Sequence, residues 1–190
     1  MALGQLGHAN TSVVATLLSL LSDLDPETRS SAAFALGHAG NTSPEVVNSL
    51  LSMLSDEDLN VKSSCIAALG RLGNDNPEMV TRLVTLLDDN NYSVRCGIAE
   101  VLGRIGNASL EVVTELLSLL SDNKWSVRFG AVEALGQLGN ADPEIMTGLV
   151  PMLGDEESLV RYGAAKVFGQ LGQANLEVVS ILPEGVTSTL

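Results

Sequence analysis

The stretch SVRFGAVEALGQLGN, residues 126–140, contains a Leu-Gly motif that returns at a fixed interval along the whole chain. Successive copies of the motif lie 33 residues apart. Its first glycines are Gly4, Gly37, Gly70, Gly103, Gly136 and Gly169, and its second glycines are Gly7, Gly40, Gly73, Gly106, Gly139 and Gly172. A period of this length is typical of repeat solenoids, in which each repeat buries its apolar side chains against its neighbours.

The period predicts one repeat domain over residues 1–190. Five full repeats follow one another at 8–40, 41–73, 74–106, 107–139 and 140–172, between partial repeats at 1–7 and 173–190. Because solenoids need polar capping repeats at their ends, we interpret an array that starts and stops inside a repeat as a segment of a longer one. A short protein with degenerate caps is the alternative.

Each repeat is predicted to form two helices, called here the A helix and the B helix. The A helix follows a capping residue, a proline and a glutamate, as in Ser43-Pro44-Glu45 and Asp142-Pro143-Glu144. The capping side chain can accept backbone N–H bonds, and proline at the first helical position has no N–H to leave unpaired. An acidic turn separates the two helices, and the second glycine of the motif ends the B helix.

An aspartate in the turn and a basic residue in the B helix lie six residues apart in every full repeat. The pairs are Asp23 with Arg29, Asp56 with Lys62, Asp89 with Arg95, Asp122 with Arg128, and Asp155 with Arg161. Because they barely vary between repeats, we interpret them as a structural ladder and not as a recognition row. The ladder is expected to cap the B helices and to connect adjacent repeats, with Arg95, Arg128 and Arg161 substantially buried against carboxylates.

Three variable columns, four residues apart, form one stripe of the B helix that faces away from the apolar core stripe. Aromatic residues are only 3% of the chain, yet the stripe holds Phe34, Tyr92, Trp125, Phe129 and Tyr162. Only Phe168 occupies a core column. Exposed aromatic side chains favour a recognition surface over gap-filling between repeats.

Composition excludes several classes of function. The formal net charge is −13, and ten Lys and Arg residues are too few and too dispersed for a nucleic-acid surface. No apolar run is long enough for a membrane span, and residues 1–10 do not resemble a secretion signal. Cys65 and Cys96 form no spacing motif, which favours a reducing, cytoplasmic location.

Catalytic or metal-binding chemistry is not predicted. His8 and His38 have no acid or thiol at catalytic or metal-ligand spacing. Cys65 replaces a core alanine, so we expect a buried, unreactive thiol. We therefore predict no enzyme activity, no metal site and no cofactor.

The B-helix pattern VRxxAAxALGxLG, together with the Asp-x5-Arg turn, resembles HEAT repeats, in particular the HEAT-like repeats of phycobilisome lyases. The sequence pattern LGNxSPEVVxxLLSLLSD is similar to that of repeat arrays in prokaryotic nucleotide-binding signalling ATPases and to that of designed repeat binders. The resemblance covers the whole chain. It implies an all-α, right-handed α-solenoid with A helices on the convex side and B helices on the concave side.

The resemblance and the aromatic stripe together predict a non-catalytic scaffold that binds a protein or peptide on its concave face. The expected contact surface contains Tyr92, Trp125, Phe129 and Tyr162, rimmed by Glu100, Glu133, Arg104 and Gln137. Given the net charge, a neutral or basic partner is expected. Two alternatives remain open: a bilin-binding, lyase-like subunit, and a designed or consensus scaffold.

The two ends of the array predict self-association. Pro183 interrupts the last A helix, and no B helix follows it to cover Val178, Val179 and Leu182. Around Leu3 and Leu6 the first partial repeat lacks the rest of its helix. We therefore expect both terminal faces to bind further copies of the chain.

Overall fold

A computed structural model describes residues 11–74, 76–139 and 142–172. Every regular element in these residues is helical, and A and B helices alternate along the chain as predicted. The A helices are α1 (Thr11–Leu20), α3 (Pro44–Ser52), α5 (Pro77–Thr85), α7 (Leu110–Ser118) and α9 (Pro143–Leu149). The B helices are α2 (Pro26–Ala39), α4 (Leu59–Gly73), α6 (Tyr92–Ile105), α8 (Trp125–Gln137) and α10 (Ser158–Gly172). The predicted all-α repeat fold is confirmed.

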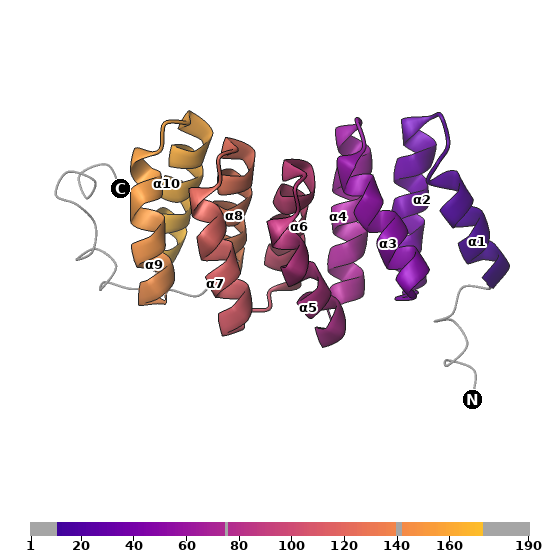
Figure 1. The fold of residues 1–190 in the computed structure, drawn as a ribbon, viewed down its shortest axis with the longest axis horizontal. Coiled ribbons are helices and arrows are strands. Elements are labelled where there is room, and N and C mark those ends of the chain that lie inside the picture. Colours follow the sequence, from indigo (N-terminus) through magenta and orange to yellow (C-terminus); the bar gives the residue numbers. More distant parts are fainter. Residues whose placement is uncertain (1–10, 75, 140–141, 173–190) are drawn as a thin grey trace. The chain divides into compact units, whose positions relative to one another are not determined.

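The chain divides into two compact parts, called here the N-terminal half (1–83) and the C-terminal half (84–190). In the N-terminal half, α2 packs against both α1 and α4. In the C-terminal half, α8 packs between α6 and α10, and α7 packs against α8. Figure 1 shows α7 and α9 in front of α8 and α10, so A helices and B helices form separate layers in this half.

The A helices begin at the capping residues that the sequence predicts. Asp142 Oδ1 accepts a hydrogen bond from the N–H of Glu144 at 2.9 Å, and Asn76 Oδ1 accepts one from the N–H of Met79 at 3.1 Å. Proline occupies the first helical position of α3, α5 and α9. Local sequence therefore fixes where these helices start.

Four A helices, α3, α5, α7 and α9, end in a feature that the sequence analysis did not anticipate, a short 3₁₀ turn. These turns are η1 (Met53–Ser55), η2 (Leu86–Asp88), η3 (Leu119–Ser121) and η4 (Val150–Gly154). The last one is longer, and α9 is correspondingly short, because Pro151 has no N–H to continue the α-helical ladder. The tightened turn directs the chain into the loop before each B helix.

Successive B helices approach closely at the Leu-Gly motif. A methyl group on Gly103 would lie 2.8 Å from the Cα of Ala134, and one on Gly37 would lie 2.7 Å from the Cα of Ala68. Glycine is required at these positions because no other side chain fits against the backbone of the next helix. The core beside them is apolar, and Phe168 in α10 is only 1% exposed, as expected for a core column.

Candidate functional site

The turns between A and B helices carry arginine–aspartate pairs that join one repeat to the next. In α8, Nε of Arg128 lies 2.7 Å from Oδ2 of Asp155, and Nη2 lies 2.8 Å from Oδ1. Arg95 contacts Asp122 through the same two atoms, and in the N-terminal half Arg29 contacts Asp56 in the same way. Each pair spans 27 residues, so the carboxylate comes from the following repeat.

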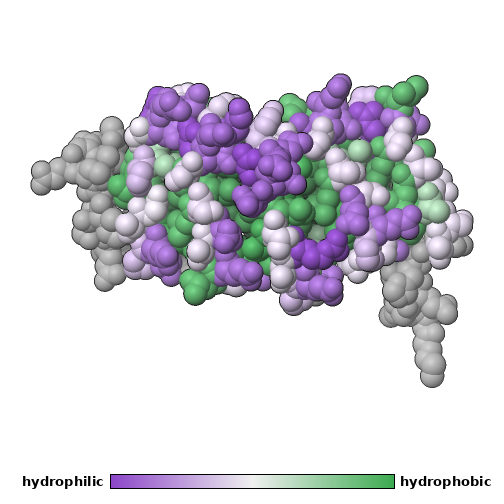
Figure 2. Space-filling view, viewed as in Figure 1, coloured by the Kyte–Doolittle hydropathy of each residue, from purple (hydrophilic) through white to green (hydrophobic). Residues whose placement is uncertain are grey.

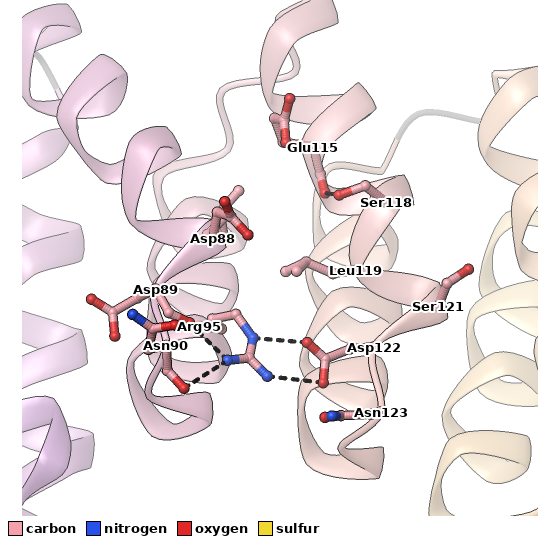
Figure 3. A pocket seen from close by; sticks show the side chains of 11 residues that line it. Asp88, Asp89, Asn90, Arg95, Glu115, Ser118, Leu119, Ser121, Asp122 and Asn123 are labelled. Carbon is pink, nitrogen blue, oxygen red and sulfur yellow. Dashed lines mark hydrogen bonds and ion pairs between the residues drawn. The ribbon is translucent and has the colours of Figure 1, made fainter.

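The third guanidinium nitrogen binds the turn of the arginine's own repeat. Nη1 of Arg95 donates to the backbone carbonyl of Asp89 at 2.7 Å and to that of Asn90 at 3.3 Å. Figure 3 shows this arrangement, with the planar guanidinium between its own turn and Asp122. A guanidinium has the rigid geometry to make both contacts at once.

The ladder aspartates do not cap the B helices, which corrects the expectation from the sequence. Their side chains accept the N–H two residues later, as Asp122 Oδ1 does from Lys124 at 2.8 Å. The helix cap is that later residue: Asp25 caps α2, Asp58 caps α4 and Asn91 caps α6. The ladder aspartate therefore stabilises the turn, while both of its oxygens also accept hydrogen bonds from the arginine of the preceding repeat.

The arginine–aspartate pairs lower the pKa of their carboxyl groups. The Arg128 guanidinium holds the pKa of Asp155 below its ordinary value, although burial opposes the shift. Arg29 lowers the pKa of Asp56 in the same way. The shared cause is a short charged hydrogen bond that favours the ionised carboxylate. The carboxylates of Asp155 and Asp56 are therefore ionised near neutral pH.

Two basic members of the ladder differ from the expected pattern. Arg161 was expected to be buried against a carboxylate, but it is exposed. Among the described residues it donates only to the backbone carbonyls of Asp155 and Glu156, at 2.7 and 2.8 Å. The residue 27 positions later, Ser188, lies outside the described part of the chain. Lys62 lies half-buried in the first turn of α4.

An open cavity of about 530 Å³ lies beside the Arg95–Asp122 pair. Its lining includes Asp88, Asp89 and Glu115, and Figure 3 shows Asp89 beside Arg95, with Asp88 and Glu115 farther from the guanidinium. The carboxylates give this edge of the C-terminal half a negative character. On the face in view in Figure 2, hydrophilic side chains of this half cover the ends of the helices and hydrophobic ones lie between them.

Three aromatic residues of the predicted contact surface are exposed on the B helices of the C-terminal half. Tyr92 and Trp125 are the first residues of α6 and α8, and Tyr162 lies in the second turn of α10. Their exposed fractions are 47%, 42% and 65% respectively. Because α8 packs against both α6 and α10, the three side chains lie at the same end of three neighbouring helices.

Phe129 was expected on the exposed stripe, but it is half-buried between helices. A methyl group on Gly163 would lie 3.1 Å from its ring, so the ring packs on α10. The same relation recurs in other repeats: Cys96 contacts Gly130, and the hydroxyls of Ser30 and Ser64 are 2.8 Å apart. Ser30, Cys96 and Phe129 therefore pack against the next B helix. The only sign of this contact in the sequence is a small residue 34 positions after each of them.

The expected rim residues form ion pairs on this face. Arg104 bonds to Glu100 at 3.0 Å within α6, and Lys166 of α10 bonds to Glu133 of α8 at 2.9 Å. Gln137 is exposed near the end of α8. The sequence analysis missed Lys124, whose ammonium lies 6.0 Å from the centre of the Tyr92 ring. A cation at this distance is attracted by the ring face.

Cys65, Cys96 and His38 each pack against or bond to neighbouring groups of the fold. Burial, with a smaller contribution from Asp56, raises the pKa of the Cys65 thiol to about 12, so it is not a nucleophile near neutral pH. Cys96 donates to the carbonyl of Ser126, and the His38 ring stacks on Phe34. No group of three or more His, Cys, Asp or Glu residues is placed to hold a metal ion within residues 11–74, 76–139 and 142–172.

Other expectations lie outside the described residues or concern membranes. His8 and the terminal apolar residues Leu3, Leu6, Val178, Val179 and Leu182 belong to segments that the structure does not describe. Within the described segments, no helix has the length and apolar character needed to cross a bilayer.

Comparison with known families identifies the repeats. A family model for HEAT repeats matches residues 14–95 and 80–146, and a model for HEAT-like repeats matches residues 125–171. The chain therefore belongs to the HEAT repeat family, as its sequence resemblance indicates. No curated protein matches the chain.

Among solved structures, the chain resembles the complex of CpcE and CpcF of phycocyanin lyase from Nostoc sp. PCC7120. The TM-score is 0.62 at 24% identity, over 83% of this chain and 99% of that one. The chain also resembles YibA of E. coli, with a TM-score of 0.55 at 22% identity over 91% of this chain and 64% of that one. An engineered protein gives a TM-score of 0.50 at 20% identity, over 90% of this chain and 85% of that one. At these identities the likeness concerns the fold.

Proposed function

We propose that the chain is a non-catalytic scaffold that binds a protein or peptide through the aromatic face of its C-terminal half. The observation that carries the proposal is the exposure of Tyr92, Trp125 and Tyr162 at the same end of α6, α8 and α10. Large aromatic side chains in water are costly unless a partner covers them, and Trp and Tyr dominate binding energy at interfaces.

The charges around the aromatic residues support a protein partner over a nucleic acid. Glu100 with Arg104 and Glu133 with Lys166 already neutralise each other, so the centre of the face is apolar and its rim polar. This division is typical of protein interfaces. With a net charge of −13, the chain as a whole repels phosphate backbones and attracts neutral or basic surfaces.

Peptide selection tests the proposal directly. A library of peptides displayed on phage is selected against the purified chain, and the binders are measured against the parent and against variants. Trp125→Ala and Tyr92→Ala are each expected to weaken binding about 30-fold, the effect of removing an interface hot spot. Phe129 is unsuitable for this test because its ring packs on Gly163, and its loss would disturb the fold.

Leu110→Ala is the matched control. Leu110 is an apolar residue of the same half, 73% exposed, but it lies on the A helix α7. It should leave peptide binding unchanged, and circular dichroism should show native helix content for all three variants. Selected peptides that bind Trp125→Ala and Tyr92→Ala as tightly as the parent would place the binding surface elsewhere.

A further inference from the structure

One contact between neighbouring B helices differs in size between the two halves of the chain. In the C-terminal half, the ring of Phe129 in α8 packs on Gly163 of α10, so a flat group fills the space between these helices. Ser30 of α2 and Ser64 of α4 occupy the corresponding positions three repeats earlier. Their hydroxyls are 2.8 Å apart, and neither side chain has the volume of a ring.

An open cavity of about 530 Å³ lies at this serine pair in the N-terminal half. Its lining includes three hydroxyls, one amide and two carboxylates, from Ser30, Ser63, Ser64, Asn60, Glu27 and Asp58. No basic side chain lines it. The cavity is therefore rich in hydrogen-bond acceptors and negatively charged, which favours a cationic donor.

The two carboxylates of the lining are available to a ligand. Arg29, the ladder arginine of α2, does not neutralise them, because its Nε and Nη2 bond to Asp56 and its Nη1 bonds to carbonyls of its own turn. Oδ1 of Asp58 caps α4 by accepting two backbone N–H groups, at 2.8 and 3.2 Å. Among the described residues, no cation forms an ion pair with Asp58 or with the exposed Glu27.

We propose that this cavity, called here the serine slot, binds an arginine side chain of a partner protein or peptide. A guanidinium is flat, as the Phe129 ring is, and carries five N–H donors that suit hydroxyl and carboxylate acceptors. A lysine ammonium has the charge without the flat shape, so it should bind less tightly. Leu59, 75% exposed, follows Asp58 in the chain and provides apolar surface for the residues beside the arginine.

A nuclear magnetic resonance titration of the isotope-labelled chain tests the proposal. The probe is the pentapeptide Ala-Leu-Arg-Leu-Ala, acetylated and amidated so that arginine is its only charge. It should shift the amide signals of Ser30, Ser63 and Ser64. The same peptide with citrulline, which keeps the flat shape without the charge, should bind at least about tenfold more weakly, and the lysine peptide about threefold more weakly.

Charge-removing variants identify the carboxylates that hold the arginine. Glu27→Gln and Asp58→Asn should each weaken binding of the arginine peptide about fivefold, and asparagine is as good a helix cap as aspartate. Glu45→Gln is the matched control. Glu45 is exposed and follows the first proline of α3, just as Glu27 follows the first proline of α2, so this variant should bind like the parent.

A filled slot gives a second test. Ser30→Phe combined with Ser64→Gly copies the pair formed by Phe129 and Gly163, so a ring should occupy the slot and abolish binding. Circular dichroism should show native helix content in this double variant. If it does not fold, the two carboxylate variants still decide the question.

Three results would overturn the proposal. They are a citrulline peptide that binds as tightly as the arginine peptide, a folded double variant that binds like the parent, and no shift of the three serine amides at about 10 mM peptide. Trp125→Ala should leave this binding unchanged, because Trp125 lies in the other half of the chain. Failure here therefore does not bear on the proposed function, and failure of the proposed function does not bear on the serine slot.

Discussion

Arg128 and Arg161 occupy the same position of adjacent repeats, yet their surroundings differ. Arg128 is 7% exposed and contacts the carboxylates of Asp155 and Glu156. Arg161 is exposed and contacts only backbone carbonyls among the described residues. Both arginines donate to the backbone carbonyls of their own turns, and among the described residues they differ in the carboxylate of Asp155, which pairs with Arg128 alone. A ladder arginine thus binds its own turn in both repeats, and Arg128 also connects its repeat to the next one through Asp155.

The largest expected loss of stability comes from removing Arg128, the arginine that pairs with an aspartate of the next repeat. Arg128→Ala leaves the carboxylate of Asp155 in a mostly buried site without its cation, and we expect the free energy of unfolding to fall by about 2–4 kcal/mol. Arg161→Ala removes only exposed contacts and should cost less than about 1 kcal/mol. Urea denaturation followed by circular dichroism measures both values. Equal losses in the two variants would contradict the contrast.

A smaller effect tests whether the close approach of successive B helices excludes side chains larger than glycine. Gly103→Ala forces a methyl group against the backbone of Ala134, and we expect a loss of about 1–3 kcal/mol. Gly154 lies in the turn before α10, and a methyl group there meets nothing within 4 Å. Gly154→Ala should therefore change stability by less than about 0.5 kcal/mol. If thermal unfolding shows similar losses for both, close approach of B helices does not explain the Leu-Gly motif.

The smallest effect is a difference in pH dependence between the two arginine variants. Arg128 lowers the pKa of Asp155, so the pair stabilises the fold fully above the unfolded value of 3.8 and less as pH falls through the lower folded value. The stability gap between the parent and Arg128→Ala should therefore narrow below about pH 4. For Arg161→Ala the gap should narrow less, because Arg161 bonds only to carbonyls and its charge makes the smallest of the contributions that lower the pKa of Asp155. Denaturation at pH 7, 4 and 3 gives both gaps.

Much of the fold could be predicted from the sequence because the signals are local. Proline, capping residues and the 33-residue period specify where helices begin and how they alternate. The 3₁₀ ends of the A helices could not be predicted, because they depend on how the last turn bends toward the next loop. Pro151 was the one visible signal among them, since it has no N–H for the α-helical ladder.

The candidate site could be predicted in part. The exposure of Tyr92, Trp125 and Tyr162 agrees with a stripe defined by helical spacing alone. The half-burial of Phe129 does not, because it results from Gly163 in the next repeat giving room for a ring. Helical spacing determines the direction of a side chain, whereas burial also depends on the size of the residue opposite.

The sequence by itself determined the repeat, its two helices, the family and the residues of the ladder. Only the tertiary structure decided that the ladder arginines reach forward to the next repeat, that the helix caps lie two residues beyond the ladder aspartates, and that Arg161 is exposed. The physical reason is range. Capping, proline geometry and apolar periodicity act within a few residues, whereas a charged pair across 27 residues exists only once two repeats have packed together.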